Sequence, residues 1–384
     1  MSPALIEATE LCETLKSWLL DAAYPMWWDR GADQEQGGFH ERLRLDGTAT
    51  GEPRRARLHP RQMYAYSVAE ELGWAGPSEQ AVQHGINFFL ARYRRPDHLF
   101  RTLVDAAGNS MDDRAVLYDQ AFALLGLAAA FDALDDEELR ETARGLHDLL
   151  RAQLSNPLAG FEESSPRLLP LLSNSHMHLF EASLAWMDLD HDPRWQTLAA
   201  QIVELALTRF IDPGSGFLRE FFDGDWQPVP GSEGRVVEPG HQFEWAWLLL
   251  RWVERTGDSS ARDIALRLID LGEDHGVDPR RGVAITSILT DHSVRDPLAR
   301  LWQQTERLKA ACIAAEHTRE PRYWTMAVAA ANGLLKYLDT PLPGLWRDKM
   351  LADGTLVEEP APASSFYHIV CAIAEFEHTL KRST

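Results

Sequence analysis

Residues 118–131 read YDQAFALLGLAAAF, and residues 135–154 read DDEELRETARGLHDLLRAQL. As a helix, the first stretch is apolar on nearly every side, whereas the second is apolar only at i, i+3 and i+4 and charged elsewhere. A helix that is apolar all round must be buried, and a helix with one apolar stripe faces water on its other side. The two segments therefore predict an inner helix followed by an outer one.

This pair of helices recurs along the chain at a spacing of roughly 60 residues, and a short Gly-aromatic or Gly-apolar signal marks each unit. The signal stands at Gly38-Phe39, Gly160-Phe161, Gly216-Phe217, Gly282-Val283 and Gly344-Leu345-Trp346, with Leu99-Phe100 in the remaining slot. Buried helices are expected to begin near Leu58, Tyr118, Asn174, Pro239, Ala299 and Ser364. Amphipathic helices are expected near residues 3–23, 77–94, 136–154, 191–211, 258–275 and 320–339.

Buried and half-exposed helices that alternate in this way predict an all-α protein, an (α/α)6 barrel. This fold is a double ring of twelve helices, here joined by short β-hairpin loops. No break in composition divides the chain, so residues 1–384 are expected to form a single catalytic domain.

Composition and net charge exclude several classes of binding partner. With 45% hydrophobic and 25% charged residues the chain resembles a soluble globular enzyme. No apolar run approaches the roughly 20 residues that a membrane helix needs. A formal charge of −20 would repel nucleic acid and anionic lipid. We therefore expect a small neutral molecule as partner, and thirteen tryptophans suit a sugar site, although tryptophan is also a common core residue.

The N-terminal stretch MSPALIEATELCETLKSWLL lacks the basic-then-apolar layout of a signal peptide. The chain has an odd number of cysteines, and their spacing matches neither a metal site nor a disulfide framework; they are Cys12, Cys312 and Cys371. These features predict a cytoplasmic protein with buried, reduced thiols. Separately, we expect a monomer or homodimer.

Each predicted buried helix opens with polar residues. They are Arg61-Gln62, Tyr118-Asp119-Gln120, Asn174 to His178, His241 to Glu244, Trp302 to Glu306, and Ser364 to His368. Polar groups on buried helices are costly unless they are satisfied or used. If the inner helices all run the same way, these groups converge on one mouth of the barrel and form a candidate site.

Histidines stand out within this set. His241 and Glu244 lie at i, i+3, as do His178 and Glu181, a spacing that lets a carboxylate orient an imidazole. A helix N-terminus disfavours the imidazolium, so a histidine such as His368 is expected to stay neutral and available as a base. A single buried histidine usually has a structural role, but three at equivalent places in a repeat favour a functional site.

Other chemistries fit the pattern less well. His176 and His178 lie at i, i+2 and point to different helix faces, so they are not expected to share a metal, and we predict neither metal nor cofactor. Glycoside hydrolysis requires two opposed carboxylates, whereas imidazoles dominate here. A non-catalytic sugar-binding barrel remains an alternative, because the tryptophans alone would serve it.

Histidines in a sugar site suit proton transfer beside a carbonyl. A base with a pKa near the working pH removes the proton, and a nearby cation stabilises the enediolate. We predict His368 and His241 as the bases and Arg61 as the cation.

Five motifs resemble the N-acylglucosamine 2-epimerase superfamily, which includes mannose isomerase, cellobiose 2-epimerase and sulfoquinovose isomerase. They are RQMYAYS from Arg61, NSHMHLFEA from Asn174, PGHQFEWAWLL from Pro239, LWQQTERLKA from Leu301 and PASSFYHIVCAIAE from Pro362. The resemblance covers nearly the whole chain. It implies that His178 assists ring opening, that His241 and His368 transfer protons, that Glu244 sets His241, and that Arg61 stabilises the enediolate. It also implies a sugar pocket lined by Tyr118, Asn174, Met177, Trp302, Glu306 and Trp346, with His176 left as a structural residue.

The segment GLWRDKMLADGTLVEEPAPASSFYHI looks most like the mannose isomerase branch. This resemblance implies an aldose–ketose isomerase that interconverts D-mannose and D-fructose. A 2-epimerase acting on mannose and glucose, or on N-acylglucosamine, would use nearly the same residues. Arg54, Arg55 and Arg57 could also receive a sulfonate or phosphate, although a solvated basic loop explains them more simply.

Overall fold

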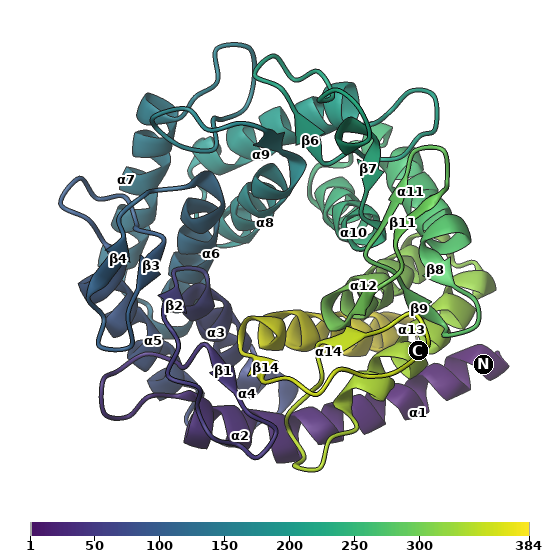
Figure 1. The fold of residues 1–384 in the computed structure, drawn as a ribbon, viewed down its shortest axis with the longest axis horizontal. Coiled ribbons are helices and arrows are strands. Elements are labelled where there is room, and N and C mark those ends of the chain that lie inside the picture. Colours follow the sequence, from purple (N-terminus) through teal and green to yellow (C-terminus); the bar gives the residue numbers. More distant parts are fainter. Residues whose placement is uncertain (1, 384) are drawn as a thin grey trace.

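The protein is built from two concentric rings of helices, as the computed structural model shows for residues 2–383 (Figure 1). The inner ring consists of α3 (Leu58–Ser67) with its short continuation α4 (Ala69–Leu72), α6 (Leu117–Leu134), α8 (Ser173–Leu189), α10 (Pro239–Thr256), α12 (Leu301–Thr318) and α14 (Ser364–Ser383). The outer ring consists of α1 (Pro3–Trp18), α5 (Ser78–Tyr93), α7 (Glu137–Gln153), α9 (Pro193–Leu205), α11 (Ser260–Gly276) and α13 (Pro321–Leu338). The predicted (α/α)6 barrel is confirmed.

Most helices begin within two residues of the predicted position. α12 begins at Leu301 because Ala299–Arg300 forms the short strand β12. Two outer helices continue as π-helical turns, η1 (Leu19–Ala23) after α1 and η3 (Ala206–Phe210) after α9. The short helix α2 (Tyr24–Met26), the π turn η2 (Trp27–Gly31) and the 3₁₀ turn η4 (Glu233–Arg235) complete the helical elements.

Short antiparallel strands join the units. The pairs are β2 (Arg54–Arg55) with β3 (Leu103–Val104) and β4 (Ser110–Asp112), β5 (Leu171–Leu172) with β6 (Phe221–Phe222), β7 (Val236–Val237) with β10 (Ser287–Leu289) and β11 (Val294–Asp296), β8 (Val277–Asp278) with β9 (Val283–Ala284), and β12 with β13 (Lys349–Met350). β1 (Arg42–Leu43) pairs with β14 (Ala361–Pro362), so the first and last units are joined directly and the ring is closed.

Burial follows the two sequence patterns. Of the described residues, α6 forms the one helix long and apolar enough to cross a membrane by length and composition, but 72% of that window is buried inside the barrel. Its composition is therefore that of an inner helix. The outer helix α7 buries Leu139, Ala143, Leu146 and Leu150, which lie on one stripe. The three cysteines are buried and unpaired, as predicted.

The repeating Gly-aromatic signal marks a hairpin that an inner helix holds in place. Its five glycines have φ between +63° and +92°, a backbone conformation that favours glycine. Just after the bend, a side chain of the inner helix accepts a hydrogen bond from a backbone N–H. The pairs are His59 with Phe39 (3.2 Å), Gln120 with Phe100 (2.9 Å), His176 with Phe161 (3.0 Å), Gln242 with Leu218 (2.8 Å) and Gln304 with Ala284 (2.8 Å). Several of the polar residues that open the inner helices are therefore structural.

His176 holds its hairpin with both ring nitrogens: Nδ1 donates to the Leu172 carbonyl at 3.0 Å and Nε2 accepts from Phe161. Glutamine at position 242 makes the same two kinds of contact. We expect His176→Gln to lower the free energy of unfolding by about 1.5 kcal/mol or less, and His176→Leu by about 1–3 kcal/mol more, because the Phe161 N–H is left buried and unpaired. Urea unfolding of both variants checks this; equal losses would contradict the hairpin role.

Candidate active site

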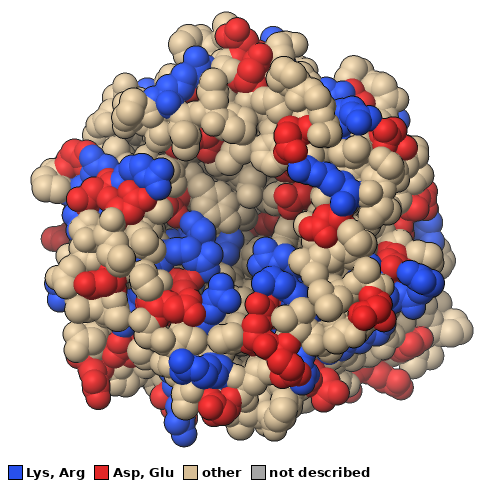
Figure 2. Space-filling view, in the orientation of Figure 1, with Lys and Arg blue, Asp and Glu red and all other residues tan. Residues whose placement is uncertain are grey.

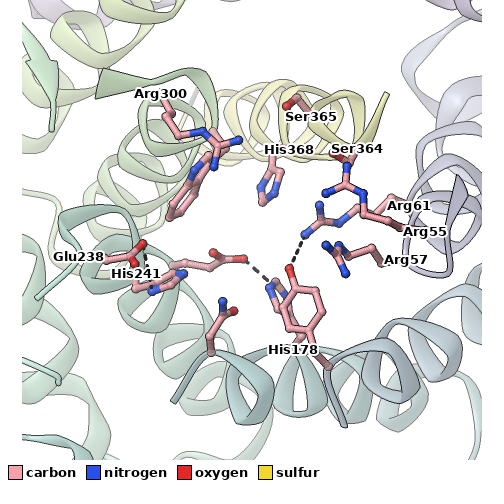
Figure 3. A pocket seen from close by; sticks show the side chains of 14 residues that line it. Arg55, Arg57, Arg61, His178, Glu238, His241, Arg300, Ser364, Ser365 and His368 are labelled. Carbon is pink, nitrogen blue, oxygen red and sulfur yellow. Dashed lines mark hydrogen bonds and ion pairs between the residues drawn. The ribbon is translucent and has the colours of Figure 1, made fainter. Parts of the chain in front are cut away.

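The N-terminal ends of the inner helices enclose a pocket at one mouth of the barrel (Figure 3). Its volume is about 290 Å³, at the small end of the range for ligand sites, which suits a molecule the size of a monosaccharide. The lining residues are Arg55, Arg57, Arg61, Tyr118, Asn174, His178, Glu238, His241, Glu244, Arg300, Trp302, Ser364, Ser365 and His368.

Eight of the eleven residues predicted for the site line this pocket: Arg61, Tyr118, Asn174, His178, His241, Glu244, Trp302 and His368. The inner helices do run the same way, so residues far apart in the chain meet here. The other three predicted residues, Met177, Glu306 and Trp346, do not line the pocket.

His368 comes from the first turn of α14. Its Nδ1 lies 2.8 Å from Glu306 Oε1, and both residues are buried. A carboxylate accepts hydrogen bonds, so Nδ1 carries the proton and Nε2 is left with a free lone pair. Burial, with the nearby cations Arg61 and Lys309, holds the pKa of His368 well below its usual value. His368 is therefore neutral at pH 7, and Glu306 lies behind it as its partner.

His241 differs from the prediction. Its Nδ1 donates to Glu220 Oε2 at 2.9 Å, and Glu238 Oε2 lies 3.7 Å away. Burial opposes charge on His241, but these two carboxylates raise its pKa to about 10. His241 is thus protonated near neutral pH and is able to donate a proton. The prediction that Glu244 sets His241 is wrong, because Glu220 makes the hydrogen bond.

His178 is paired as its i, i+3 spacing predicted. Its Nδ1 lies 3.1 Å from Glu181 Oε2, while Glu244 Oε1 is at 4.0 Å. Burial lowers the pKa of His178 to about 4, although the bond to Glu181 works in the opposite direction. His178 is therefore neutral, and its ring packs 5.2 Å from that of Tyr118.

A set of buried acids holds the pocket wall from behind, and sequence reasoning missed it. Glu41 binds Arg55, Glu163 accepts from Ser175 Oγ, Glu220 accepts from Ser173 Oγ and His241, and Asp348 binds Ser365 and Arg300. Each acid follows a repeat glycine by three or four residues. That recurrence is the signal that could have identified them.

Three buried carboxylates and one buried lysine lie beneath the histidines. Lys309 Nζ is 2.6 Å from Glu306 Oε2 and 3.9 Å from the centre of the Trp247 ring. Burial opposes ionisation of Glu181, but His178, Lys309 and Tyr367 lower its pKa to about 2. Burial and the neighbouring Glu306 raise the pKa of Glu244 well above its usual value.

Two groups in this layer have ligand atoms close enough together for a metal ion: His178, Glu181 and Glu244, and Glu244, Glu306 and His368. The sequence did not predict this convergence. Lys309 already supplies a positive charge beside the second group, so these carboxylates do not require a metal for charge compensation.

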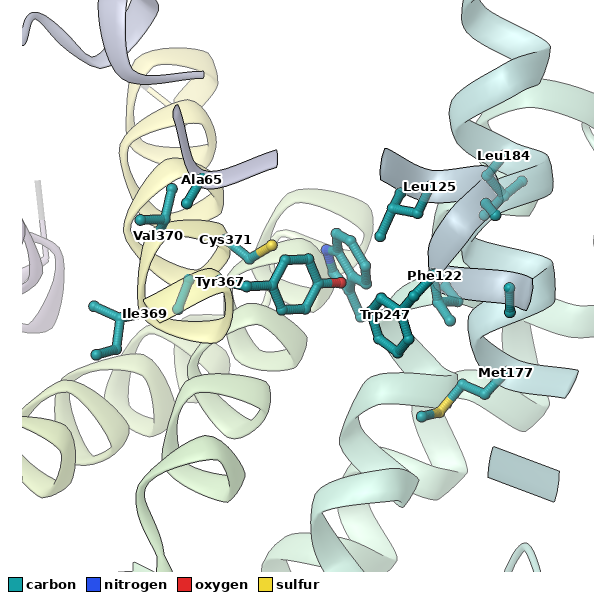
Figure 4. Close-up of a cluster of buried hydrophobic side chains, with 14 of the residues drawn as sticks. Ala65, Phe122, Leu125, Met177, Leu184, Trp247, Tyr367, Ile369, Val370 and Cys371 are labelled. Atoms are coloured by element: carbon teal, nitrogen blue, oxygen red, sulfur yellow. The ribbon is translucent and has the colours of Figure 1, made fainter. Parts of the chain in front are cut away.

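A cluster of buried apolar side chains lies between the inner helices (Figure 4). Met177 is fully buried there, among side chains that include Phe122 and Trp247, and it does not line the pocket. Trp346 is fully buried too, stacked on Trp27 with ring centres 4.7 Å apart. The family resemblance implied that both residues line the sugar pocket, but in the structure both side chains are buried in the core.

The sequence matches the profile of the N-acylglucosamine 2-epimerase (GlcNAc 2-epimerase) family over residues 37–372. It is 48% identical to a mannose-6-phosphate isomerase of Rhizobium meliloti (strain 1021), over 96% of this chain and 97% of that protein. It is 26% identical to a D-mannose isomerase of Thermobifida fusca, over 89% and 90%.

Solved structures share the fold. A cellobiose 2-epimerase from Spirochaeta thermophila DSM 6192 superposes with a TM-score of 0.88 at 22% identity, covering 100% of both chains. A D-mannose isomerase superposes with a TM-score of 0.88 at 21% identity, covering 99% of this chain and 100% of that one. The chain belongs to the N-acylglucosamine 2-epimerase family of sugar isomerases and epimerases.

Proposed function

We propose that the protein interconverts D-mannose and D-fructose through a cis-enediol(ate), without a metal ion. This proposal rests on two histidines in one pocket whose surroundings favour opposite protonation states. His368 is neutral and His241 is protonated, and both rings pack near Trp302, with ring centres at 5.9 and 5.2 Å. A base and an acid beside one substrate are what transfer of a proton next to a carbonyl requires.

In this scheme His178 assists opening of the sugar ring. His368 Nε2 then removes the proton from C2 of open-chain mannose, and the carbonyl oxygen O1 takes a proton from His241. The resulting enediol loses the proton of its O2 hydroxyl to His241, and the proton on His368 goes to C1. The carbonyl now stands at C2, both histidines regain their starting states, and no atom is gained or lost.

Arg61 supports the charged intermediate. Its side chain is 6% exposed and lines the pocket, and Nη2 donates to Tyr118 Oη at 3.0 Å. A cation held in a site shielded from water stabilises developing oxyanion charge strongly.

Asn174 Oδ1 is buried without a protein partner in the described part of the chain, and it is therefore free to accept a hydrogen bond from a sugar hydroxyl.

The two protonation states predict the pH dependence. Activity requires neutral His368, so it should fall as the pH drops through that lowered pKa. It also requires protonated His241, so it should fall as the pH rises through about 10. We expect kcat/KM to be flat from near-neutral pH to about pH 9 and to decline on both sides. A profile with a single acid limb near pH 6.5 would contradict the assignment.

The test is proton NMR of EDTA-treated protein with D-mannose in deuterated water. We expect fructose to form and deuterium to enter the sugar, because the transferred proton exchanges with solvent on the histidine. Glucose as the product would mean that the proton returns to C2, as in a 2-epimerase. Loss of activity with EDTA, restored by a divalent metal, would disprove the metal-free part of the proposal.

Phosphorylated mannose is a second candidate, because the R. meliloti relative is a mannose-6-phosphate isomerase and several arginines line the pocket wall. The same experiment with mannose 6-phosphate separates the two substrates. Binding without turnover of any sugar would instead indicate a carbohydrate-binding barrel.

A further inference from the structure

The pocket wall carries a charge opposite to that of the whole chain. The formal net charge is −20, yet four arginines line the pocket and only two carboxylates do: Arg55, Arg57, Arg61 and Arg300 against Glu238 and Glu244. Figure 2 shows the blue side chains gathered around the central hollow. The inner helices also direct their N-terminal dipoles at this mouth, which favours negative charge there. A neutral sugar uses little of this positive potential.

Two of the four arginines are committed to other contacts. Arg61 lies deep in the pocket, against the Phe122 ring at 4.3 Å and beside the reacting histidines. Arg300 directs Nε and Nη2 at Asp348, at 3.1 and 2.9 Å. Arg55 and Arg57 remain on the wall that Arg61 shares (Figure 3).

Arg57 has unused donors. Its one side-chain hydrogen bond within residues 2–383 runs from Nη1 to Asp119 Oδ1 at 3.3 Å, which leaves Nε and Nη2 without a protein acceptor. The guanidinium lies 5.2 Å from the centre of the Tyr118 ring. Arg55 is anchored through Nε and Nη2 to buried Glu41, and its Nη1 is free of protein partners in the same range.

The spacing of these arginines matches the length of a sugar. Arg57 has helical backbone angles at the start of α3, and Arg61 follows it by one helical turn. Side chains four residues apart on a helix lie about 5–6 Å from each other at Cβ. That separation is a few carbon–carbon bonds, so one arginine can hold an oxygen at the reacting end while the other meets a group at the far end.

We propose that Arg55 and Arg57 form a subsite for a terminal oxyanion, a phosphate or a sulfonate, at the end of the sugar remote from its carbonyl. The placement of the reacting end at Arg61 and His368 rests on the function proposed above. Guanidinium groups that are anchored from behind and open toward a ligand are suited to such tetrahedral oxyanions. Because the two anions share this chemistry, the substrate assay must distinguish them.

The test compares kcat/KM for mannose, mannose 6-phosphate and a hexose with a sulfonate on C6. The protein should prefer one charged sugar, and the preferred one identifies the anion. Arg57→Gln and Arg55→Gln should each lower the ratio of kcat/KM for that sugar over mannose by about 10–100-fold, the effect of one charge-assisted hydrogen bond. Arg280→Gln, at a side chain that is 83% exposed, is the matched control and should leave the ratio unchanged. No preference for either charged sugar, or an equal loss on all three in the Arg57 variant, would overturn the subsite.

Failure of catalysis can be separated from failure of the subsite. Calorimetric titration of the His368→Ala variant with mannose and with mannose 6-phosphate or the sulfonated hexose reports binding without turnover. Tighter binding of a charged sugar, lost on adding Arg57→Gln, would support the subsite even if the isomerase proposal fails. Equal affinity for charged and uncharged sugars would overturn it, with circular dichroism showing that each variant is folded.

Discussion

Replacing His368 by alanine should lower the rate of mannose isomerisation by about 10²–10⁴-fold, the usual contribution of a general base. The structure gives the reason, because His368 is held neutral by burial and by nearby cations, with Nδ1 bonded to Glu306 and Nε2 free. Proton NMR in deuterated water measures two quantities at once, formation of the ketose and entry of deuterium. Both should fall together if His368 removes the proton.

His191→Ala is the matched control, since His191 is exposed on the connection between α8 and α9 and lies outside the pocket. It should leave both rates unchanged. If His368→Ala retains full activity while loss of Glu238 and Glu244 abolishes it, the chemistry is that of a carboxylate pair, as in a hydrolase, and the proton-transfer scheme is wrong.

The fold could be predicted because burial is recorded locally in the sequence. The contrast between the all-apolar α6 and the striped α7 shows which helix is inside, and the repeated glycine signal gives the number of units. Each buried helix must be shielded from water by its neighbours and by an outer helix, and repeating this arrangement gives a double ring. The exact start of α12 could not be predicted, because β12 depends on pairing with β13, roughly one unit further along the chain.

The site could be predicted as a set of residues but not as a set of pairs. A spacing of i, i+3 correctly joined His178 to Glu181, yet the same spacing misassigned Glu244 to His241. The actual partner, Glu220, lies on the hairpin before the helix, and its contact is fixed by tertiary structure. Met177 shows the same limit: Asn174 and His178 on the same helix reach the pocket, but the Met177 side chain is buried in the core.

The protonation states of the two histidines were the hardest property to predict from the sequence. Both His241 and His368 open inner helices, and the helix dipole alone predicts two neutral bases. Burial lowers the pKa of both histidines, but Glu220 and Glu238 outweigh it at His241, whereas Arg61 and Lys309 add to it at His368. Charges within a few ångströms outweigh the dipole of a helix end.

Replacing Lys309 by methionine should have the largest effect on stability, a loss of about 3–5 kcal/mol in the free energy of unfolding. Lys309 is fully buried, and its pKa is raised because the neighbouring carboxylates, Glu306 foremost, outweigh the burial that opposes its charge. Without it, Glu181, Glu244 and Glu306 share a buried space with no cation among them. Urea unfolding measures the loss, and Lys381→Met, at a side chain that is 66% exposed, should show a much smaller one.

The same substitution should lower activity through His368. Burial raises the pKa of Glu306, whereas Lys309 lowers it and so favours the carboxylate that accepts the Nδ1 proton of His368. When the lysine is gone, Glu306 takes up a proton more readily and ceases to be an obligate acceptor, so the free lone pair is no longer fixed on Nε2. The double variant Lys309→Met/Glu306→Gln removes the unpaired charge and should regain part of the lost stability, but not the activity. If Lys309→Met leaves stability and rate unchanged, the buried ion pair has no role. If the double variant regains both stability and activity, Glu306 does not orient His368.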